Sequence, residues 1–207
     1  MRSPQLNRHF ISLIIFSLLF LALSLLYEQP FLSQINLTLQ RLIYNYSNGA
    51  YLDFFTRMTR LGSAPLYIMV SLILMLGLSL MKNYKGLIFV PINLIGSALL
   101  NVLLKHLLLK PRPEVEHLVY AGSYSFPSGH SMNAMVFYGF LAFLLMEFLG
   151  PIWAKWLTLL IAALFILLIG MSRVYLGVHY PLDIIGGYSA GLAWLSLIIF
   201  IYKQIES

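Results

Sequence analysis

Two histidines and an aspartate lie at points where the chain would otherwise continue as apolar membrane segments. His179 and Asp183 are four residues apart at the predicted start of a helix, so the carboxylate can bond one ring nitrogen and leave the other free to attack. His130, in the segment SFPSGHSMNA, is suited to protonate a departing oxygen. An oriented nucleophile with a separate acid is typical of phosphoryl transfer through a covalent intermediate.

Three cations, Lys105, Arg112 and Arg173, accompany these residues. Fixed positive charges around one point would repel one another beside a neutral ligand, but they suit the several oxygens of a phosphate group. Ser128 and Gly129 add backbone N–H donors and the positive end of a helix, and a glycine lets the backbone approach the phosphoryl oxygens closely. The sequence therefore predicts a phosphate site.

The elements that must position these residues are membrane helices. Of the 207 residues, 60% are hydrophobic and only 10% are charged, which is far more apolar than a soluble domain of this length. Six apolar runs predict spans, and none alternates as a strand of a β-barrel would. The runs are residues 10–27, 64–81, 86–104, 131–149, 156–171 and 182–201, of which the short fifth should extend toward Arg173. We therefore expect an all-α fold, a six-transmembrane-helix bundle that forms one domain over residues 1–207.

Six crossings would bring every candidate residue to one side of the membrane. The third and fifth spans end there, and the fourth and sixth begin there. Taken singly, a cation at a membrane edge, or a His and an Asp one helical turn apart, is more often structural than catalytic. Ionisable residues gathered at membrane depth are costly, so their convergence favours function.

The region 31–62 is neither loop-like nor apolar enough to span. Apolar residues follow one helical face on each side of Ser47-Asn48-Gly49, while Arg57 and Arg60 lie off the second face. We expect two amphipathic interfacial helices that lie at the membrane surface between the first and second spans. The sequence leaves open whether they cap the bundle or guide a lipid substrate.

Further features bear on compartment and topology. Cysteine is absent, which excludes disulfides and thiolate metal sites. The first apolar run continues past the small residues Ala22 and Ser24 to Tyr27, so we expect an uncleaved anchor rather than a cleaved signal peptide. With the three cations of the predicted site set aside, more Lys and Arg fall on the side of the N-terminus, which predicts a cytoplasmic N-terminus. We expect no nucleic-acid partner, and the oligomeric state stays unknown.

The spacing of the polar residues resembles the three-part signature of the type 2 phosphatidic acid phosphatase superfamily. Six spans are also usual in that superfamily, and the signature covers residues 105–183 without a departure. Its parts are Lys105 with Arg112-Pro113, then Pro127-Ser128-Gly129-His130, and then Ser172-Arg173 with His179 and Asp183. The size and context of the chain resemble small bacterial members that act on phosphatidylglycerophosphate or undecaprenyl diphosphate.

This resemblance implies a role for each matching position. His179 would be the nucleophile that forms a phosphohistidine, Asp183 its orienting partner and His130 the general acid. Hydrolysis would need no cofactor and no metal ion. The enzyme would lie in the bacterial cytoplasmic (inner) membrane, with its active site facing the periplasm or cell exterior. The implied phosphate-binding shell consists of Lys105, Arg112, Ser128, Gly129 and Arg173.

Several functions remain open from the sequence. The substrate is expected to be a lipid phosphate in the bilayer, namely phosphatidylglycerophosphate, phosphatidic acid or undecaprenyl diphosphate. A narrower alternative is a dedicated undecaprenyl diphosphate phosphatase that recycles a cell-wall carrier. An alternative of another class is a non-catalytic lipid-phosphate binder or flippase, although a binder has no need for an oriented histidine plus a second histidine.

Overall fold

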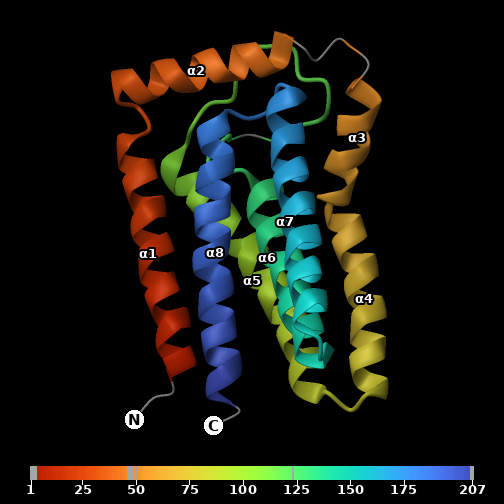
Figure 1. The fold of residues 1–207 in the computed structure, drawn as a ribbon. Coiled ribbons are helices and arrows are strands. Elements are labelled where there is room, and N and C mark those ends of the chain that lie inside the picture. Colours follow the sequence, from red (N-terminus) through yellow and green to blue (C-terminus); the bar gives the residue numbers. More distant parts are fainter. Residues whose placement is uncertain (1–3, 46–48, 50, 123, 206–207) are drawn as a thin grey trace.

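The fold of the chain is a bundle of eight helices in the part that the computed structural model describes, residues 4–45, 49, 51–122 and 124–205 (Figure 1). No strand occurs in these residues, so the predicted all-α fold is confirmed. The helices are α1 (Pro4–Leu26), α2 (Pro30–Asn45), α3 (Leu52–Leu61), α4 (Ala64–Leu80), α5 (Tyr84–Leu108), α6 (Gly129–Phe148), α7 (Ile152–Tyr175) and α8 (Pro181–Gln204).

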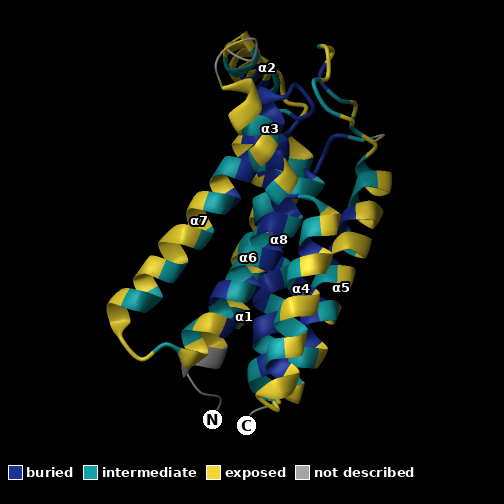
Figure 2. Cartoon of the chain, turned by 90° about the vertical axis from the view of Figure 1, so that its right-hand side faces the viewer, coloured by how far each residue is buried: buried dark blue, intermediate teal, exposed yellow. Residues whose placement is uncertain are grey.

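Five helices, α1, α5, α6, α7 and α8, are each long and apolar enough to cross a membrane within the described ranges. The bent pair α3 and α4 would make a sixth span if the two are taken together. Helix α8 is the most buried of the five, while the outward faces of α1, α5 and α7 carry exposed apolar side chains such as Leu25, Leu99 and Leu160 (Figure 2). An apolar exterior of this kind is expected where the surrounding solvent is lipid.

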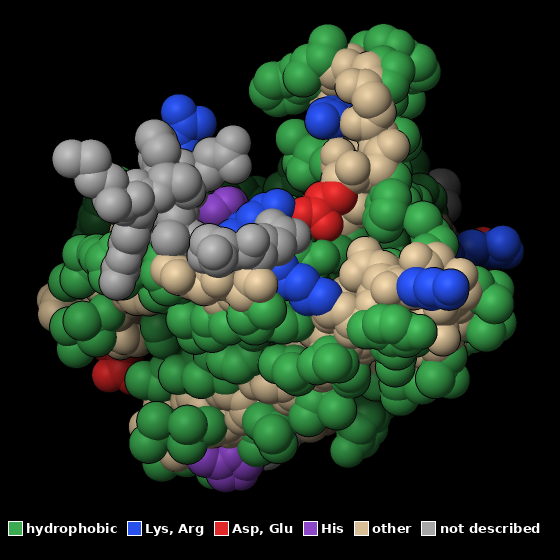
Figure 3. Space-filling model, turned by 90° about the horizontal axis from the view of Figure 1, so that it is seen from below, with side chains coloured by type: hydrophobic (Ala, Val, Ile, Leu, Met, Phe, Trp, Pro, Cys, Tyr) green, Lys and Arg blue, Asp and Glu red, His purple; other side chains and the backbone are tan. Residues whose placement is uncertain are grey.

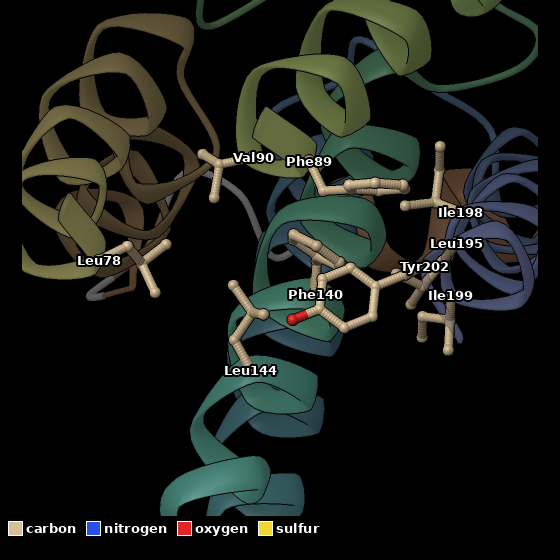
Figure 4. Packing of buried hydrophobic residues seen from close by; sticks show 9 residues of the cluster. All are labelled: Leu78, Phe89, Val90, Phe140, Leu144, Leu195, Ile198, Ile199 and Tyr202. Atoms are coloured by element: carbon tan, nitrogen blue, oxygen red, sulfur yellow. The ribbon is translucent and has the colours of Figure 1, made fainter. Parts of the chain in front are cut away.

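The main apolar core lies at the end of the bundle that also carries both termini. It joins α4, α5, α6 and α8, so these helices are held together away from the candidate residues (Figure 4). The members of this core are Leu78, Phe89, Val90, Phe140, Leu144, Leu195, Ile198, Ile199 and Tyr202.

The outer face of the same end carries basic side chains among hydrophobic ones (Figure 3). The sequence places several cations at the helix ends and turns here: Arg8, Lys82, Lys85, Lys155 and Lys203. These are the cations from which the cytoplasmic orientation of this end was predicted, and the orientation stays a prediction.

The two helices predicted between the first and second spans are present, but only one of them has the expected orientation. Helix α2 lies across the end of the bundle, as expected for an interfacial helix (Figure 1). Helix α3 meets α4 at a bend of 47° and packs along α7, so it lies beside the bundle and not across its end as α2 does (Figure 1). The physical reason is a set of contacts to the bundle: Phe55 meets Tyr175 with ring centroids 4.3 Å apart, and the hydroxyl of Tyr138 donates to the carbonyl of Leu61. Ser47 and Asn48, predicted to break the helical pattern, lie outside the described residues.

Close packing of α6 against α8 brings two parts of the predicted site together. A Cβ at Gly187 would lie 2.7 Å from the carbonyl oxygen of Ser128, so only a residue without a side chain permits this approach. The N–H of Ser128 then donates to the carbonyl of Asp183 over 3.0 Å. The start of α6 is thereby fixed to the start of α8.

Candidate active site

The ends of four spanning helices gather the candidate residues at the end of the bundle opposite the termini. Lys105 lies in the last turn of α5 and Arg173 in the last turn of α7. His130 lies in the first turn of α6, and Asp183 in the first turn of α8. The predicted convergence on one side of the bundle is therefore present in the structure.

His179 and Asp183 form a buried pair. Nδ1 of His179 lies 3.2 Å from Oδ2 of Asp183, and the two side chains are only 2% and 0% exposed. Burial lowers the pKa of His179 to about 3, and the hydrogen bond to Asp183 offsets this effect only in part. Because the carboxylate accepts at Nδ1, the neutral ring carries its proton there and keeps a lone pair on Nε2.

The carboxylate of Asp183 has further donors that sequence reasoning missed. The hydroxyl of Tyr27 donates to Oδ1 over 2.8 Å, and the hydroxyl of Ser125 donates to Oδ2. The backbone N–H of Tyr180 also donates to Oδ2 over 2.9 Å, so the carboxylate closes the first turn of α8 as an acid at the third helical position does. Ser125 could have been suspected from its place beside the Pro127 motif, whereas nothing in the sequence singled out Tyr27.

Arg112 lies at the other ring nitrogen of His179. Its Nη1 lies 3.4 Å from Nε2 of His179 and donates to the carbonyl of Val178 over 2.6 Å. Its Nε donates to the carbonyl of Gly122 over 2.7 Å. Burial lowers the pKa of Arg112 from its usual value, but a guanidinium stays charged at neutral pH.

Arg173 is a buried cation whose partner is a hydroxyl and not a carboxylate. The residue is 4% exposed, and its Nη1 donates to Oγ1 of Thr59 over 2.6 Å. Its Nε has no hydrogen-bond partner among the described residues. Thr59 lies on α3, and the sequence carried no signal that it belongs to the site.

Lys105 completes the set of cations by donating to the carbonyl of Tyr124. Within the described part of the chain, no carboxylate lies within ion-pair distance of Lys105, Arg112 or Arg173. Burying cations without an anion is unfavourable, so this arrangement favours an anionic ligand.

The turn before α6 is shaped by Asn101 of α5. The amide of Asn101 donates to the carbonyl of Pro127 over 3.3 Å, and its Oδ1 would lie 2.8 Å from a Cβ at residue 129, which explains the glycine there. Ser128 is the N-cap, and its hydroxyl accepts from Ser131. Its own N–H is bonded to Asp183 and the N–H of Ser131 to its hydroxyl, so the first-turn donors left for an anion are the N–H groups of Gly129 and His130.

His130 is half-buried and lies against the bend between α3 and α4. A Cβ at Gly62 would lie 3.0 Å from Cδ2 of His130. The part of the chain between the first two spans therefore contacts the site at two points, at Arg173 through Thr59 and at His130 through this bend.

No group of three or more His, Asp or Glu side chains is arranged to bind a metal ion in the described residues. Hydrolysis without a metal ion stays a prediction that chelation can test.

Comparison with known proteins identifies the family. The profile of the PAP2 superfamily matches residues 86–206, which include every candidate residue from Lys105 to Asp183. The chain is 37% identical over 160 residues to phosphatidylglycerophosphatase B of Bacillus subtilis (strain 168), covering 74% of each protein. It is 40% identical over 100 residues to an undecaprenyl-diphosphatase of Sulfolobus acidocaldarius, covering 48% of this chain and 38% of that protein.

A solved structure supports the same assignment. The crystal structure of a transmembrane PAP2 type phosphatidylglycerolphosphate phosphatase from Bacillus subtilis matches with a TM-score of 0.86. The match is 30% identical in sequence and covers 94% of this chain and 97% of that one. The chain therefore belongs to the PAP2 superfamily.

Proposed function

We propose that this multi-pass membrane protein is a lipid phosphatase that hydrolyses a phosphomonoester or diphosphate of a lipid through a phosphohistidine at residue 179. The observation that carries the proposal is the group of three cations, Lys105, Arg112 and Arg173, which lack a carboxylate partner among the described residues. One of them lies beside the free nitrogen of His179. A phosphate group supplies the missing negative charge.

The first step forms a bond from Nε2 of His179 to phosphorus and breaks the bond from phosphorus to the lipid oxygen. His130 gives its proton to that oxygen as it leaves. Asp183 stabilises the ring as it becomes positively charged on phosphorylation. The three cations stabilise the charge that spreads over the phosphoryl oxygens in the transition state.

The second step releases inorganic phosphate. Water attacks phosphorus, and His130, now neutral, accepts a proton from that water. The N–P bond breaks, and His179 regains the neutral ring that its buried position favours. In this scheme the fixed cations supply the positive charge that a divalent ion would otherwise bring.

We propose phosphatidylglycerophosphate as the leading substrate, ahead of phosphatidic acid. The support is the relative named for that activity, which is matched over 74% of both proteins, whereas the undecaprenyl-diphosphatase is matched over 48% of this chain. A dedicated role in undecaprenyl diphosphate hydrolysis is the second candidate, since the chain is 40% identical to that enzyme over the 100 residues matched.

The test is phosphate release by purified protein in detergent containing EDTA. Phosphatidylglycerophosphate, phosphatidic acid and undecaprenyl diphosphate are assayed side by side, and the highest kcat/KM is expected on the first. Activity that disappears in EDTA and returns with magnesium would contradict the proposed role of the cations. Tight lipid binding without phosphate release from any substrate would favour the binder or flippase.

A further inference from the structure

A hydrogen-bonded chain runs from α2 to the catalytic carboxylate. The side-chain amide of Asn36 donates to the hydroxyl of Tyr27 over 3.1 Å, and that hydroxyl donates to Oδ1 of Asp183 over 2.8 Å. All three residues are buried, at 3%, 5% and 0% exposure. A hydroxyl has a single proton, so the Tyr27 hydroxyl that donates to the carboxylate can still accept from Asn36. Both hydrogen bonds of the chain are therefore donated in the direction of Asp183.

Asn36 makes a second bond that fixes the helix to the site. Its Oδ1 accepts from the backbone N–H of Leu182 over 3.0 Å. That N–H lies in the first turn of α8, where helical N–H groups have no partner of their own. One amide side chain therefore joins α2 both to the start of α8 and to Tyr27.

Helix α2 presents a polar side to the protein because of these contacts. Asn36 and Gln40, one turn apart, are buried, whereas the apolar side chains of Phe31 and Leu42 are exposed. An amphipathic helix that covered a core would show the opposite pattern. On this buried side, Asn36 makes the hydrogen bonds that reach the site, whereas Nε2 of Gln40 has no hydrogen-bond partner among the described residues.

The two oxygens of Asp183 have different partners. Oδ2 accepts from His179, Ser125 and the N–H of Tyr180, while the bond to Oδ1 comes from Tyr27. Without the Tyr27 hydroxyl, a buried carboxylate oxygen would lose a charge-assisted bond, and the carboxylate would rotate to recover one. Rotation would move Oδ2 away from Nδ1 of His179.

We propose that Tyr27 is a positioning residue that holds the carboxylate of Asp183 in the rotation required to orient His179, and that α2 holds Tyr27 through Asn36. The ammonium group of Lys110 lies over the ring of Tyr27. The inference rests on the proposed function, since it assigns Tyr27 to the same reaction.

The test uses Tyr27→Phe, which removes the hydroxyl and keeps the ring and its contact with Lys110. The expected result is a loss of roughly 10-fold or more in kcat with little change in KM, because the bond lost is one to a charged group and the phosphate shell stays intact. The matched control is Tyr44→Phe on α2, whose hydroxyl donates to the carbonyl of Glu116 over 3.0 Å. This control should keep the kcat of the wild type.

A double-mutant cycle separates positioning from general stability. If Tyr27 acts through Asp183, Tyr27→Phe should have almost no further effect on phosphoenzyme formation in an Asp183→Asn background. An equal loss in both backgrounds, or no loss in the wild-type background, would overturn the inference. Asn36→Ala, which keeps Tyr27, is measured in the same cycle in case Tyr27→Phe fails to fold. Wild-type protein that releases no phosphate would instead overturn the proposed function.

Discussion

The guanidinium of Arg112 lies 3.4 Å from Nε2 of His179, on the ring nitrogen that Asp183 leaves free. Bonds to the carbonyls of Gly122 and Val178 fix its orientation. A positive charge beside a nucleophilic nitrogen disfavours attack by that nitrogen, unless a dianion contacts both groups. The pairing of Arg112 with His179 is therefore suited to a phosphate group that contacts both. In the proposed mechanism, the nitrogen that attacks and the cation that stabilises the transition state therefore lie next to each other.

The two histidines should respond differently to the leaving group. His179→Ala is expected to abolish turnover and phosphoenzyme on every substrate, because the nucleophile is gone. His130→Ala should lose about 10²–10⁴-fold on a lipid phosphate, whose alkoxide needs a proton to depart. It should retain much more of its rate on an aryl phosphate, whose leaving group departs without help. Steady-state rates and trapping of the phosphoenzyme check both expectations.

Asp183→Asn serves as the intermediate case in this series. It should lose activity because the ring loses its orienting charge, but the pocket for phosphate stays in place. The assigned roles are wrong if both histidine variants show the same dependence on the leaving group. They are also wrong if phosphate is trapped on residue 130.

Mildly acidic pH should not inactivate His179 by protonating it. Because burial lowers the pKa of His179 from its ordinary 6.5 to about 3, the ring stays neutral in the folded protein throughout that range. The test uses His130→Ala with an aryl phosphate, whose leaving group needs no acid. Its rate of phosphoenzyme formation should not fall at pH 6.5, because His179 is not protonated there. A rate loss that matches the titration of an ordinary histidine would contradict the assignment.

The lowered pKa of His179 should also make the stability of the fold depend on pH in one direction. Below pH 6.5 the unfolded chain binds a proton at His179 and the folded protein does not, so this residue makes the fold less stable as pH falls toward about 3. The melting temperature in detergent should therefore fall more between pH 7 and pH 5 in the wild type than in His179→Gln. Equal falls in the two proteins would contradict a lowered pKa.

Gly129→Ala should disturb the turn that begins α6. The added methyl would lie 2.8 Å from Oδ1 of Asn101, and overpacking of this kind typically costs about 1–3 kcal/mol. A higher KM for lipid phosphate and a lower melting temperature are expected, since either the turn moves or the Asn101 amide shifts and loses its bond to the carbonyl of Pro127. Gly122→Ala is the control, because no atom lies within 4 Å of the added methyl there. Similar effects from the two variants would show that the Asn101 contact is unimportant.

The active-site end should face the periplasm or cell exterior. A cysteine-free chain allows single cysteines to be read without background. Tyr120→Cys, at a position 93% exposed beside the site, should react with an impermeant thiol reagent in intact cells. Met81→Cys, at an exposed turn on the opposite end, should react only after lysis. The reverse pattern of labelling would invert the orientation.

The sequence alone determined the helical class and five of the six predicted spans in the described part of the chain, and it singled out the eight candidate residues of the site. Lipid cannot hydrogen-bond to backbone N–H and C=O groups, so a long apolar run that does not belong to a closed β-barrel must cross the membrane as a helix. Counting the crossings then assigns each helix end to one side of the membrane. His179 and Asp183 were predictable as a pair from their spacing at a predicted helix start, although the structure places His179 two residues before α8. Asp183 reaches back to it from the first turn, where its carboxylate also accepts from the N–H of Tyr180.

Tertiary structure alone decided which other residues support that site. Tyr27 is 156 positions from Asp183, and Thr59 is 114 from Arg173, so no local spacing relates them. The orientation of α3 also depended on packing against α7, since an amphipathic pattern shows that one face is apolar but not whether lipid or protein covers it. Long-range hydrogen bonds and the choice of helix partner arise only when the bundle closes, and for that reason they had no signal in the sequence.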